Sequence, residues 1–228
     1  MAAAGLTAWG NTWQADVFAV PSIVDAEDVW AATMDATAGH RGKALQVLVC
    51  AANAPLVGLA IQSGFAMTDE LSGTTWMNAD QRPPVTRVDG FALVDRVTRA
   101  NRLHPMIARN GELVEPRLRQ CSLYDPTLDL AVEDAAGRVA GYALFWFDRT
   151  TRVGLLEPMR VEDEYQRRGL ARMLLTNGLD RLGRAGARRL KVGFETDAAR
   201  NLYVGAGFVQ TSIDRLLIRP APDERCGH

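Results

Sequence analysis

The most informative stretch of this 228-residue sequence combines arginines with a glycine at the expected start of a helix. Residues 166–171 read QRRGLA and follow a short apolar segment. The first turn of a helix carries backbone N–H groups with no intrahelical partner and the positive end of the helix dipole. Gly169 lacks the Cβ that would obstruct an anion, and Arg167, Arg168 and Arg172 add positive charge. This order of strand, loop and helix predicts a cradle for a phosphate or pyrophosphate.

The same residues have a plainer interpretation, which is a solvated arginine cluster at the start of a surface helix. The two common nucleotide-binding motifs are missing, since the sequence has no G-x-x-x-x-G-K-[ST] segment and no G-x-G-x-x-G after a strand. The pattern therefore disfavours P-loop and Rossmann proteins and leaves other phosphate-bearing ligands open.

Composition and charge narrow the class of protein further. Of all residues, 47% are hydrophobic and 23% are charged, which predicts a folded protein with a sizeable core. The net charge of −1 favours neither nucleic acid nor an anionic membrane as a partner. No apolar run approaches the ~20 residues of a membrane span, and the first residues lack the pattern of a signal peptide. Three widely spaced cysteines and three isolated histidines predict reduced thiols, no metal site and a cytoplasmic location.

The elements that must position the arginine loop follow an α/β pattern in the second part of the chain. The expected strands are residues 90–94, 128–132, 139–147, 153–161, 190–192 and 213–218, and the expected helices are 95–120 (interrupted near 104 and 110), 169–182 and 198–204. Turn residues at 133–138 between two β-rich runs predict an antiparallel hairpin. Pro158 cannot donate to a sheet ladder, so we expect a bulge or an edge in the fourth strand. The element order predicts a mixed α/β domain.

The first part of the chain gives weaker signals, with helices expected at 25–39 and 55–62 and strands at 45–49 and 74–77. Residues 78–84 are polar, include two prolines and predict a linker between two domains. A shift of 143 residues aligns 44–68 with 187–211 without a gap and gives six identities in 25 positions. The matching order of elements indicates an internal duplication, and coincidence among small and apolar residues is the alternative.

Two segments of the second part resemble motifs of the GCN5-related N-acetyltransferase (GNAT) family. Residues 166–171 resemble the family's Q/R-x-x-G-x-G/A motif, and residues 196–208 (TDAARNLYVGAGF) resemble its N-x-x-A-x-x-L-Y-x-x-x-G-F signature. Segments 141–146 and 156–159 are also similar to bacterial members. The resemblance covers residues 85–219. It implies an α/β fold with a mixed, mostly antiparallel sheet of the acyl-CoA N-acyltransferase type at 85–222, preceded at 1–79 by a smaller, truncated and degenerate segment of similar type.

The resemblance implies that coenzyme A, as acetyl-CoA, is the co-substrate. Backbone amides of residues 167–172 would bind its pyrophosphate, and backbone groups of Met159 and Val161 would bind the pantetheine arm and polarise the thioester carbonyl. Thr196 stands where the family usually has Asn, and Asn201 supplies an alternative polar group. The implied cofactor-binding residues are Met159, Val161, Arg167, Arg168, Gly169, Leu170, Ala171, Arg172, Thr196 and Asn201.

Two side chains take catalytic roles under the same resemblance. Tyr203 matches the tyrosine with which family members protonate the departing thiolate, and its ordinary pKa near ~10 keeps it protonated at neutral pH. The alternative for Tyr203 is an aromatic residue that only packs on the sheet. Glu157 is the candidate base for the substrate amine, because a carboxylate in an apolar strand is costly to bury without a partner. The alternatives for Glu157 are exposure to solvent, an ion pair with Arg160, or orientation of the substrate alone.

The implied activity is acyl transfer from acetyl-CoA to a primary amine, by direct transfer in a ternary complex. The acceptor is a small molecule or a peptide, selected by residues 95–124, and the expected assembly is a monomer or homodimer. A module that binds or senses acyl-CoA without catalysis, and a scaffold without a ligand, are the alternatives. The first part has acidic residues in 23–28, no glycine at that helix start, and Ala60 opposite Tyr203. We therefore expect the first part to lack both the coenzyme-binding loop and the general acid.

Overall fold

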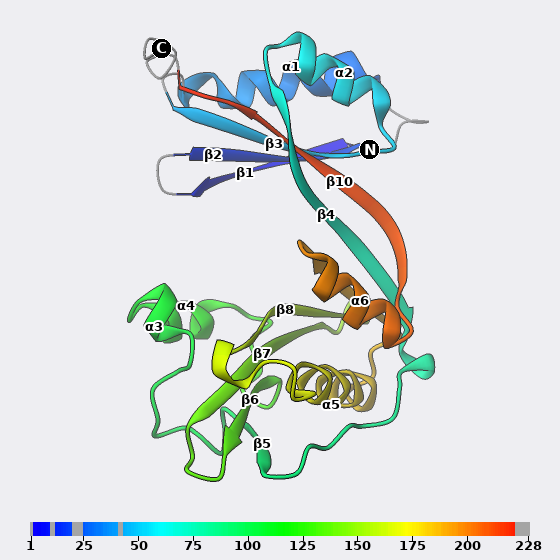
Figure 1. Ribbon diagram of the computed structural model, residues 1–228. Helices are drawn as coiled ribbons and strands as arrows, with labels where there is room; N and C mark the ends of the chain where they lie inside the picture. The colour runs from blue at the N-terminus through cyan, green and yellow to red at the C-terminus, as the bar shows by residue number, and fades with distance from the viewer. Residues whose placement is uncertain (1, 10–11, 20–24, 41–42, 222–228) are drawn as a thin grey trace. The chain divides into compact units, whose positions relative to one another are not determined.

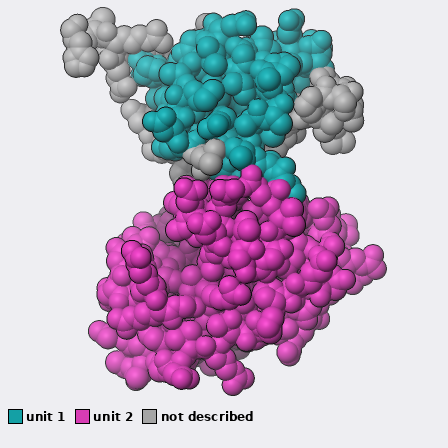
Figure 2. All heavy atoms as spheres, turned by 45° about the vertical axis from the view of Figure 1, so that its right-hand side comes forward, with its two compact units in different colours: residues 1–73, 211–228 teal, residues 74–210 magenta. Residues whose placement is uncertain are grey.

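The computed structural model describes residues 2–9, 12–19, 25–40 and 43–221. The chain forms two compact units, which Figure 2 shows in different colours. Unit 1 comprises residues 1–73 and 211–228, and unit 2 comprises residues 74–210. The segment 78–84, which the sequence suggests as a linker, lies inside unit 2. Each unit is described separately below.

Unit 2 contains a five-membered run of strands with helices packed against it (Figure 1). The strands are β5 (Phe91–Asp95), β6 (Asp129–Asp134), β7 (Val139–Asp148), β8 (Val153–Val161) and β9 (Arg189–Phe194), in the spatial order β9-β8-β7-β6-β5. β5 to β8 pair antiparallel with their neighbours, whereas β8 and β9 are parallel. The predicted mixed, mostly antiparallel sheet and the predicted hairpin are confirmed.

The helices of unit 2 are α3 (Ile107–Asn110), α4 (Val114–Gln120), α5 (Leu170–Ala185) and α6 (Asp197–Gly205). α5 follows Gly169 and ends at Gly186, both of which have left-handed backbone, with φ of 81° and 100°. A Cβ added to Gly178 of α5 would lie 2.0 Å from the Phe145 ring of β7. This close approach fixes α5, and with it the loop that precedes it, against the sheet. No helix in the described part of the chain is long and apolar enough to cross a membrane.

The predicted helix at 95–120 is only partly correct. α3 and α4 occupy its second half, but residues 96–101 form consecutive turns. The Arg96 guanidinium donates to the carbonyls of Arg99, at 2.8 Å, and Arg102, at 2.6 Å. The Arg99 N–H donates to the Asp95 carbonyl at 3.0 Å, as in a helix, but the helical ladder does not continue, and Arg96 gives two carbonyls of the segment a side-chain partner. Apolar spacing along the sequence cannot reveal such a substitution of partners.

Unit 1 contains strands β1 (Ala2–Trp9), β2 (Thr12–Ala19) and β3 (Ala44–Cys50) and helices α1 (Ala26–Thr37) and α2 (Ala54–Gln62). α1, β3 and α2 confirm three predicted elements. β1 and β2 are additional to the prediction, because the alanine-rich AAAGLTAW segment lacks a clear alternation of apolar and polar residues. At the start of α1, Asp25 caps the helix by accepting the N–H of Glu27 at 2.8 Å. Ile23 and Val24, from the acidic segment named above, lie outside the described residues.

Strands β4 (Ala66–Asn78) and β10 (Val209–Arg219) each contribute residues to both units. In unit 1, β10 pairs antiparallel with β3, and Leu217 stands opposite Val47. In unit 2, the Thr75 hydroxyl of β4 donates to the Val192 carbonyl of β9 at 3.1 Å. β4 follows a helix of unit 1 and β10 follows a helix of unit 2. Unit 1 is therefore completed by β10, which follows the last helix of unit 2. Unit 2 is completed by β4, which follows the last helix of unit 1.

Two helix–turn–strand segments share the same local geometry. The bounds of α2 and α6 are related by the 143-residue shift, since 54 + 143 = 197 and 62 + 143 = 205, and the starts of β4 and β10 obey it as well. Gly64 and Gly207 both have left-handed backbone, with φ of 85° and 99°. Phe65 and Phe208 are both 3% exposed. The two segments thus agree in boundaries, turn conformation and burial, beyond the six identities in the sequence.

Candidate active site

A groove of about 590 Å³ lies at the C-terminal end of β8. Its walls come from β8, from the loop before α5 and from the first turns of α5 and α6. The lining residues are Met159, Arg160, Val161, Gln166, Arg167, Gly169, Leu170, Ala171, Arg172, Ala198, Ala199 and Leu202. Seven of the ten residues that the sequence suggests for coenzyme binding are among them, and Arg168, Thr196 and Asn201 are not. The structure thus brings the end of a strand and two helix starts to one cavity.

β8 is bulged where it enters the groove. The pairing register of β7 with β8 shifts between Ala143 and Phe145. Glu157 and Pro158 of β8 together stand opposite one residue of β7. A bulge interrupts the ladder and leaves backbone groups without a strand partner. The predicted bulge is confirmed, and it lies directly before the groove-lining Met159.

The loop between β8 and α5 turns through two residues with left-handed backbone. Arg167 has φ of 60° and Gly169 has φ of 81°. Turns of this kind arrange successive backbone N–H groups into a concave surface that suits an anion. Gly169 is also the N-cap of α5, so the free N–H groups of the first helical turn begin at this point. Backbone conformation and helix polarity therefore both favour a negatively charged ligand here.

The arginines of this loop have different partners. Arg168 donates to the Glu164 carbonyl at 3.1 Å, and its guanidinium lies 5.4 Å from the centre of the Tyr165 ring. Arg172 donates to the Gly205 carbonyl at 3.4 Å, which joins the first turn of α5 to the end of α6. Within the described part of the chain, the Arg167 guanidinium has no hydrogen bond or ion pair. Arg168 thus stabilises the loop, and Arg167 offers a free positive charge at the groove.

The start of α6 forms the opposite wall. Thr196 caps this helix by accepting the N–H of Ala199 at 3.2 Å, and its exposed side chain does not line the groove. Asn201 is exposed on the same helix and also lies outside the lining. Ala198, Ala199 and Leu202 contribute instead, and the sequence-based selection omitted them because small and apolar residues carry no chemical signal. The omitted Gln166 and Arg160 also line the groove; the first is part of the motif quoted above.

Tyr203 and Glu157 lie near each other beside the bulge. Tyr203 is 5% exposed, and burial together with the negative charge of Glu157 raises its pKa to about 12. Its ring packs edge-on against Phe208, with centroids 6.2 Å apart. The Glu157 side chain is exposed, and its carboxylate has no ion pair or hydrogen bond within the described part of the chain. Arg160 pairs with Glu162, at 3.4 Å, rather than with Glu157.

A second cavity, of about 420 Å³, lies beside the segment that follows β5. Tyr124 lines this cavity, and its ring centre is 6.5 Å from that of Trp146. The Trp146 indole N–H donates to the Glu157 carbonyl at 2.7 Å. The Tyr124 hydroxyl donates to Asp129 at 2.8 Å, and Asp129 also bonds His104 at 2.9 Å. Burial and the charge of Asp129 raise the pKa of Tyr124. This chain of contacts joins the 96–124 region to the bulge of β8.

Comparison with known proteins agrees with this geometry. Residues 97–208 match the sequence profile of the Acetyltransferase (GNAT) family, and no curated protein is significantly similar to the chain. The chain is similar in fold to a GCN5-related N-acetyltransferase from Sphaerobacter thermophilus, with a TM-score of 0.70, 16% identity and coverage of 96% of this chain and 76% of that one. For a tandem GNAT protein from the clavulanic acid biosynthesis pathway, the TM-score is 0.67 and the identity 16%, with coverage of 92% of this chain and 75% of that one. For a GCN5-related N-acetyltransferase from Kribbella flavida, the TM-score is 0.60 and the identity 13%, with coverage of 91% of this chain and 81% of that one.

At these identities the structural likeness establishes the fold, which is that of the acyl-CoA N-acyltransferases. The sequence match covers the segment that contains the bulged strand, the arginine loop and α6. Residues 97–208 therefore form a domain that matches the GNAT acetyltransferase family, whose general activity is acyl transfer.

Proposed function

We propose that the protein is an N-acyltransferase that transfers the acetyl group of acetyl-CoA to a primary amine. The single observation that carries this proposal is the groove at the end of β8, which combines a bulged strand, a left-handed loop and Arg167, whose guanidinium is unpaired among the described residues. Enzyme-bound acetyl-CoA would supply an acyl group activated as a thioester. All other requirements fall on the protein, which must hold the coenzyme, orient the amine and move two protons.

The groove suits a long ligand with an anionic end. The loop amides of 167–172 and the Arg167 guanidinium provide for a pyrophosphate, because a nest of N–H groups and a free cation complement its charge. Gly169 permits a close approach at this point, since its backbone is left-handed and it carries no Cβ. Towards the bulge the lining becomes apolar at Met159 and Leu202, which favours an uncharged arm. Backbone groups of Met159 and Val161 then hold this arm and polarise the carbonyl oxygen.

Two side chains move the protons. The Glu157 carboxylate accepts a proton from the substrate ammonium, directly or through water, and the neutral amine then attacks. Glu157 is available for this role because its carboxylate has no partner among the described residues. A bond forms between the amine nitrogen and the carbonyl carbon, and the carbon–sulfur bond breaks. Tyr203 donates its hydroxyl proton to the leaving sulfur, and its pKa of about 12 keeps that proton in place at neutral pH. The amine nitrogen gives up its second proton as the carbon–sulfur bond breaks, and this proton restores the Tyr203 hydroxyl through solvent. Glu157 releases its proton to water, so the atoms and charges balance without an oxidant.

The proposal is tested by mixing the protein with acetyl-CoA and a panel of amines and following the release of free thiol. Tyr203→Phe is expected to lower the rate by about two to four orders of magnitude if the tyrosine is the general acid. Tyr142→Phe is the matched control, because Tyr142 is equally buried at 5% exposure and does not line the groove. Release of thiol at the wild-type rate by Tyr203→Phe would remove the acid from the proposal.

Binding is measured separately with coenzyme A in thermal melts. A ligand at one hundred times its dissociation constant adds about 2.7 kcal/mol to stability. A stabilised protein that turns over no amine would instead be a module that binds or senses acyl-CoA. An unchanged melt at saturating coenzyme A would exclude both functions.

We further propose that residues 1–79 are a degenerate, partial copy of the transferase fold. The shared geometry of the two helix–turn–strand segments supports this origin. The copy retains the fold without the chemistry, because α1 starts with Asp25, Glu27 and Asp28 where α5 starts with Gly169. Carboxylates stabilise a helix N-terminus but repel a pyrophosphate. Ala60 also stands where the second copy has Tyr203.

A further inference from the structure

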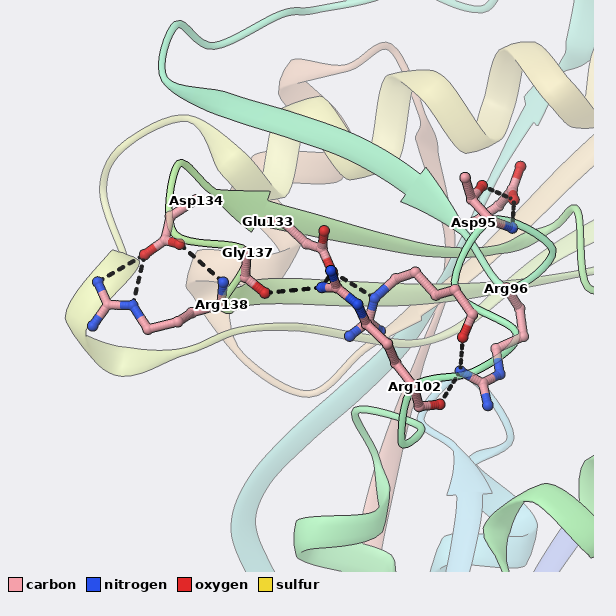
Figure 3. Close-up of polar contacts among 9 residues, drawn as sticks. Asp95, Arg96, Arg102, Glu133, Asp134, Gly137 and Arg138 are labelled. Atoms are coloured by element: carbon pink, nitrogen blue, oxygen red, sulfur yellow. Dashed lines mark hydrogen bonds and ion pairs between the residues drawn. The ribbon is translucent and has the colours of Figure 1, made fainter.

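The hairpin between β6 and β7 carries two adjacent carboxylates with different partners (Figure 3). Asp134 closes the turn, since its side chain accepts the N–H groups of Ala136, at 3.0 Å, and Arg138, at 2.9 Å. The Arg138 guanidinium adds an ion pair with Asp134 at 2.7 Å. These bonds hold the Asp134 carboxylate in one orientation. A hydrogen bond from the Tyr165 hydroxyl, together with the contacts to Arg138, lowers the pKa of Asp134. The hairpin therefore presents a fixed acceptor to whatever packs beside it.

The neighbour of Asp134 is the residue that leads into the arginine loop. The Tyr165 hydroxyl donates to Asp134 at 2.7 Å, and Tyr165 is 5% exposed. Two cations lie near its ring, with Arg168 at 5.4 Å and Arg138 at 5.9 Å from the ring centre. Tyr165 stands one residue before Gln166, the first groove-lining residue of the loop. The loop is thus anchored at its N-terminal end by a hydroxyl–carboxylate bond and by the Arg168 contact.

Glu133 connects the same hairpin to the segment that follows β5. Its carboxylate accepts from Arg99 at 2.6 Å and from Arg102 at 2.8 Å. Arg102 also donates to the carbonyl of Gly137, in the hairpin turn, at 3.2 Å, as Figure 3 shows. Arg96 then ties the segment together through the carbonyls of Arg99 and Arg102. The segment that replaces the expected helix is therefore held by one strand end.

We propose that the β6–β7 hairpin positions both ligand-binding segments of the enzyme, with Asp134 and Tyr165 fixing the coenzyme loop and Glu133 fixing the acceptor-side segment at 96–102. The inference rests on the proposed acyl transfer and adds positioning residues that touch neither ligand. Consecutive residues of a strand point to opposite faces of the sheet, so one strand end can hold two separate segments. The two carboxylates are expected to control different kinetic parameters.

The proposed role of Tyr165 in coenzyme binding is tested with Tyr165→Phe, which keeps the ring and removes the hydroxyl. The dissociation constant for coenzyme A should rise about ten- to hundredfold, the effect of losing one hydrogen bond to a charged group. S-acetylpantetheine lacks the pyrophosphate, so its turnover should stay within about twofold of wild type. Amide hydrogen exchange of residues 166–170, measured without ligand, should become faster.

The proposed role of Glu133 in positioning residues 96–102 is tested with Glu133→Gln. The KM for the best amine among spermidine, phenethylamine and a lysine-containing peptide should rise, and exchange at 96–102 should quicken. The dissociation constant for coenzyme A should stay within about twofold of wild type. Asp148→Asn is the matched control, because Asp148 closes the β7–β8 turn through Thr150 and Thr151 and has no contact with either segment. It should change neither binding nor exchange at these segments.

The outcomes separate this proposal from the function on which it rests. If wild type binds coenzyme A and Tyr165→Phe binds it equally well, with unchanged exchange at 166–170, the positioning role is refuted and acyl transfer stands. If Asp148→Asn lost coenzyme A affinity as much as Tyr165→Phe, the positioning role would also be refuted, since the effect would then follow from any weakened hairpin. Wild type that binds no coenzyme A would overturn both proposals.

Discussion

Gly169 offers a quantitative test of the coenzyme loop. The residue has φ of 81°, and a Cβ added there would have the Val88 side chain as its nearest neighbour, at 3.5 Å. This distance is an ordinary van der Waals contact, so Gly169→Ala introduces no clash within the protein. The remaining cost is conformational, and a left-handed alanine is roughly 1–2 kcal/mol less favourable than a right-handed one. Within the free protein the substitution therefore perturbs one backbone preference, and its new Cβ obstructs only a bound pyrophosphate.

The cost of Gly169→Ala can appear in two places. If the loop keeps its conformation, the free energy of unfolding falls by about 1–2 kcal/mol, and any loss of affinity for coenzyme A comes from the added Cβ alone. If the loop relaxes in the free protein, stability is retained and the affinity falls by about five- to thirtyfold. Because the two effects share one thermodynamic cycle, the losses of stability and of binding energy should add to at least about 1–2 kcal/mol in either case, and any excess measures the obstruction of the pyrophosphate by the new Cβ.

The assay combines denaturant unfolding with calorimetric titration of coenzyme A for wild type and Gly169→Ala. Gly64→Ala is the matched control, because Gly64 has φ of 85° in the corresponding turn of unit 1 and a Cβ there would meet nothing within 4 Å. It should lose stability by a similar amount and leave coenzyme A binding unchanged. If the losses of stability and of coenzyme A binding energy in Gly169→Ala add to nearly zero, that result refutes the argument. A loss of coenzyme A affinity in Gly64→Ala equal to that in Gly169→Ala would also refute it.

Three further predictions concern the base, the core and the acid. Glu157→Gln should lower the rate of amine acetylation by about two to four orders of magnitude without weakening coenzyme A binding, whereas Glu70→Gln in unit 1 should change neither. Met77→Ala should cost about 2–5 kcal/mol in denaturant unfolding, since Met77 is 5% exposed in the core of unit 2, and Met67→Ala on the same strand, at 47% exposure, should cost far less. The raised pKa of Tyr203 implies stability that is full below the unfolded-state pKa of 10.0 and is lost as pH rises through about 12. Tyr203→Phe should therefore flatten the loss of stability above pH 10, by up to about 1.4 kcal/mol per pH unit.

Local signals explain which parts of the fold were predictable from the sequence. The apolar stripe of α5 and the turn residues of the β6–β7 hairpin act over a few residues, and both elements occur where they were expected. Gly169 and Pro158 likewise impose backbone constraints that hold in any context. The loop and the bulge, which together make most of the groove, follow from such constraints.

Other features depend on contacts between distant residues. Residues 96–102 have helical spacing, but the buried Arg96 bonds the carbonyls of Arg99 and Arg102, and Glu133 binds the side chains of the same two arginines. β1 is rich in alanine and becomes a strand through its ladder with β2. Thr196 matched a motif position, yet its hydroxyl is used to cap α6. In each case the deciding partner is distant in sequence, or an alternative local hydrogen bond wins.

The two units show how little of a transferase site is specified by the fold alone. The helix–turn–strand geometry around Phe65 and Phe208 is the same, with equal burial and left-handed glycines at matching places. Apolar burial and one turn conformation are sufficient to retain this geometry. In the proposed mechanism, coenzyme binding depends in addition on a glycine and cations at one helix start, and acid catalysis depends on one hydroxyl. These few positions can change without loss of the fold, and unit 1, with Glu27 at its helix start and Ala60 opposite Tyr203, has the composition expected after such changes.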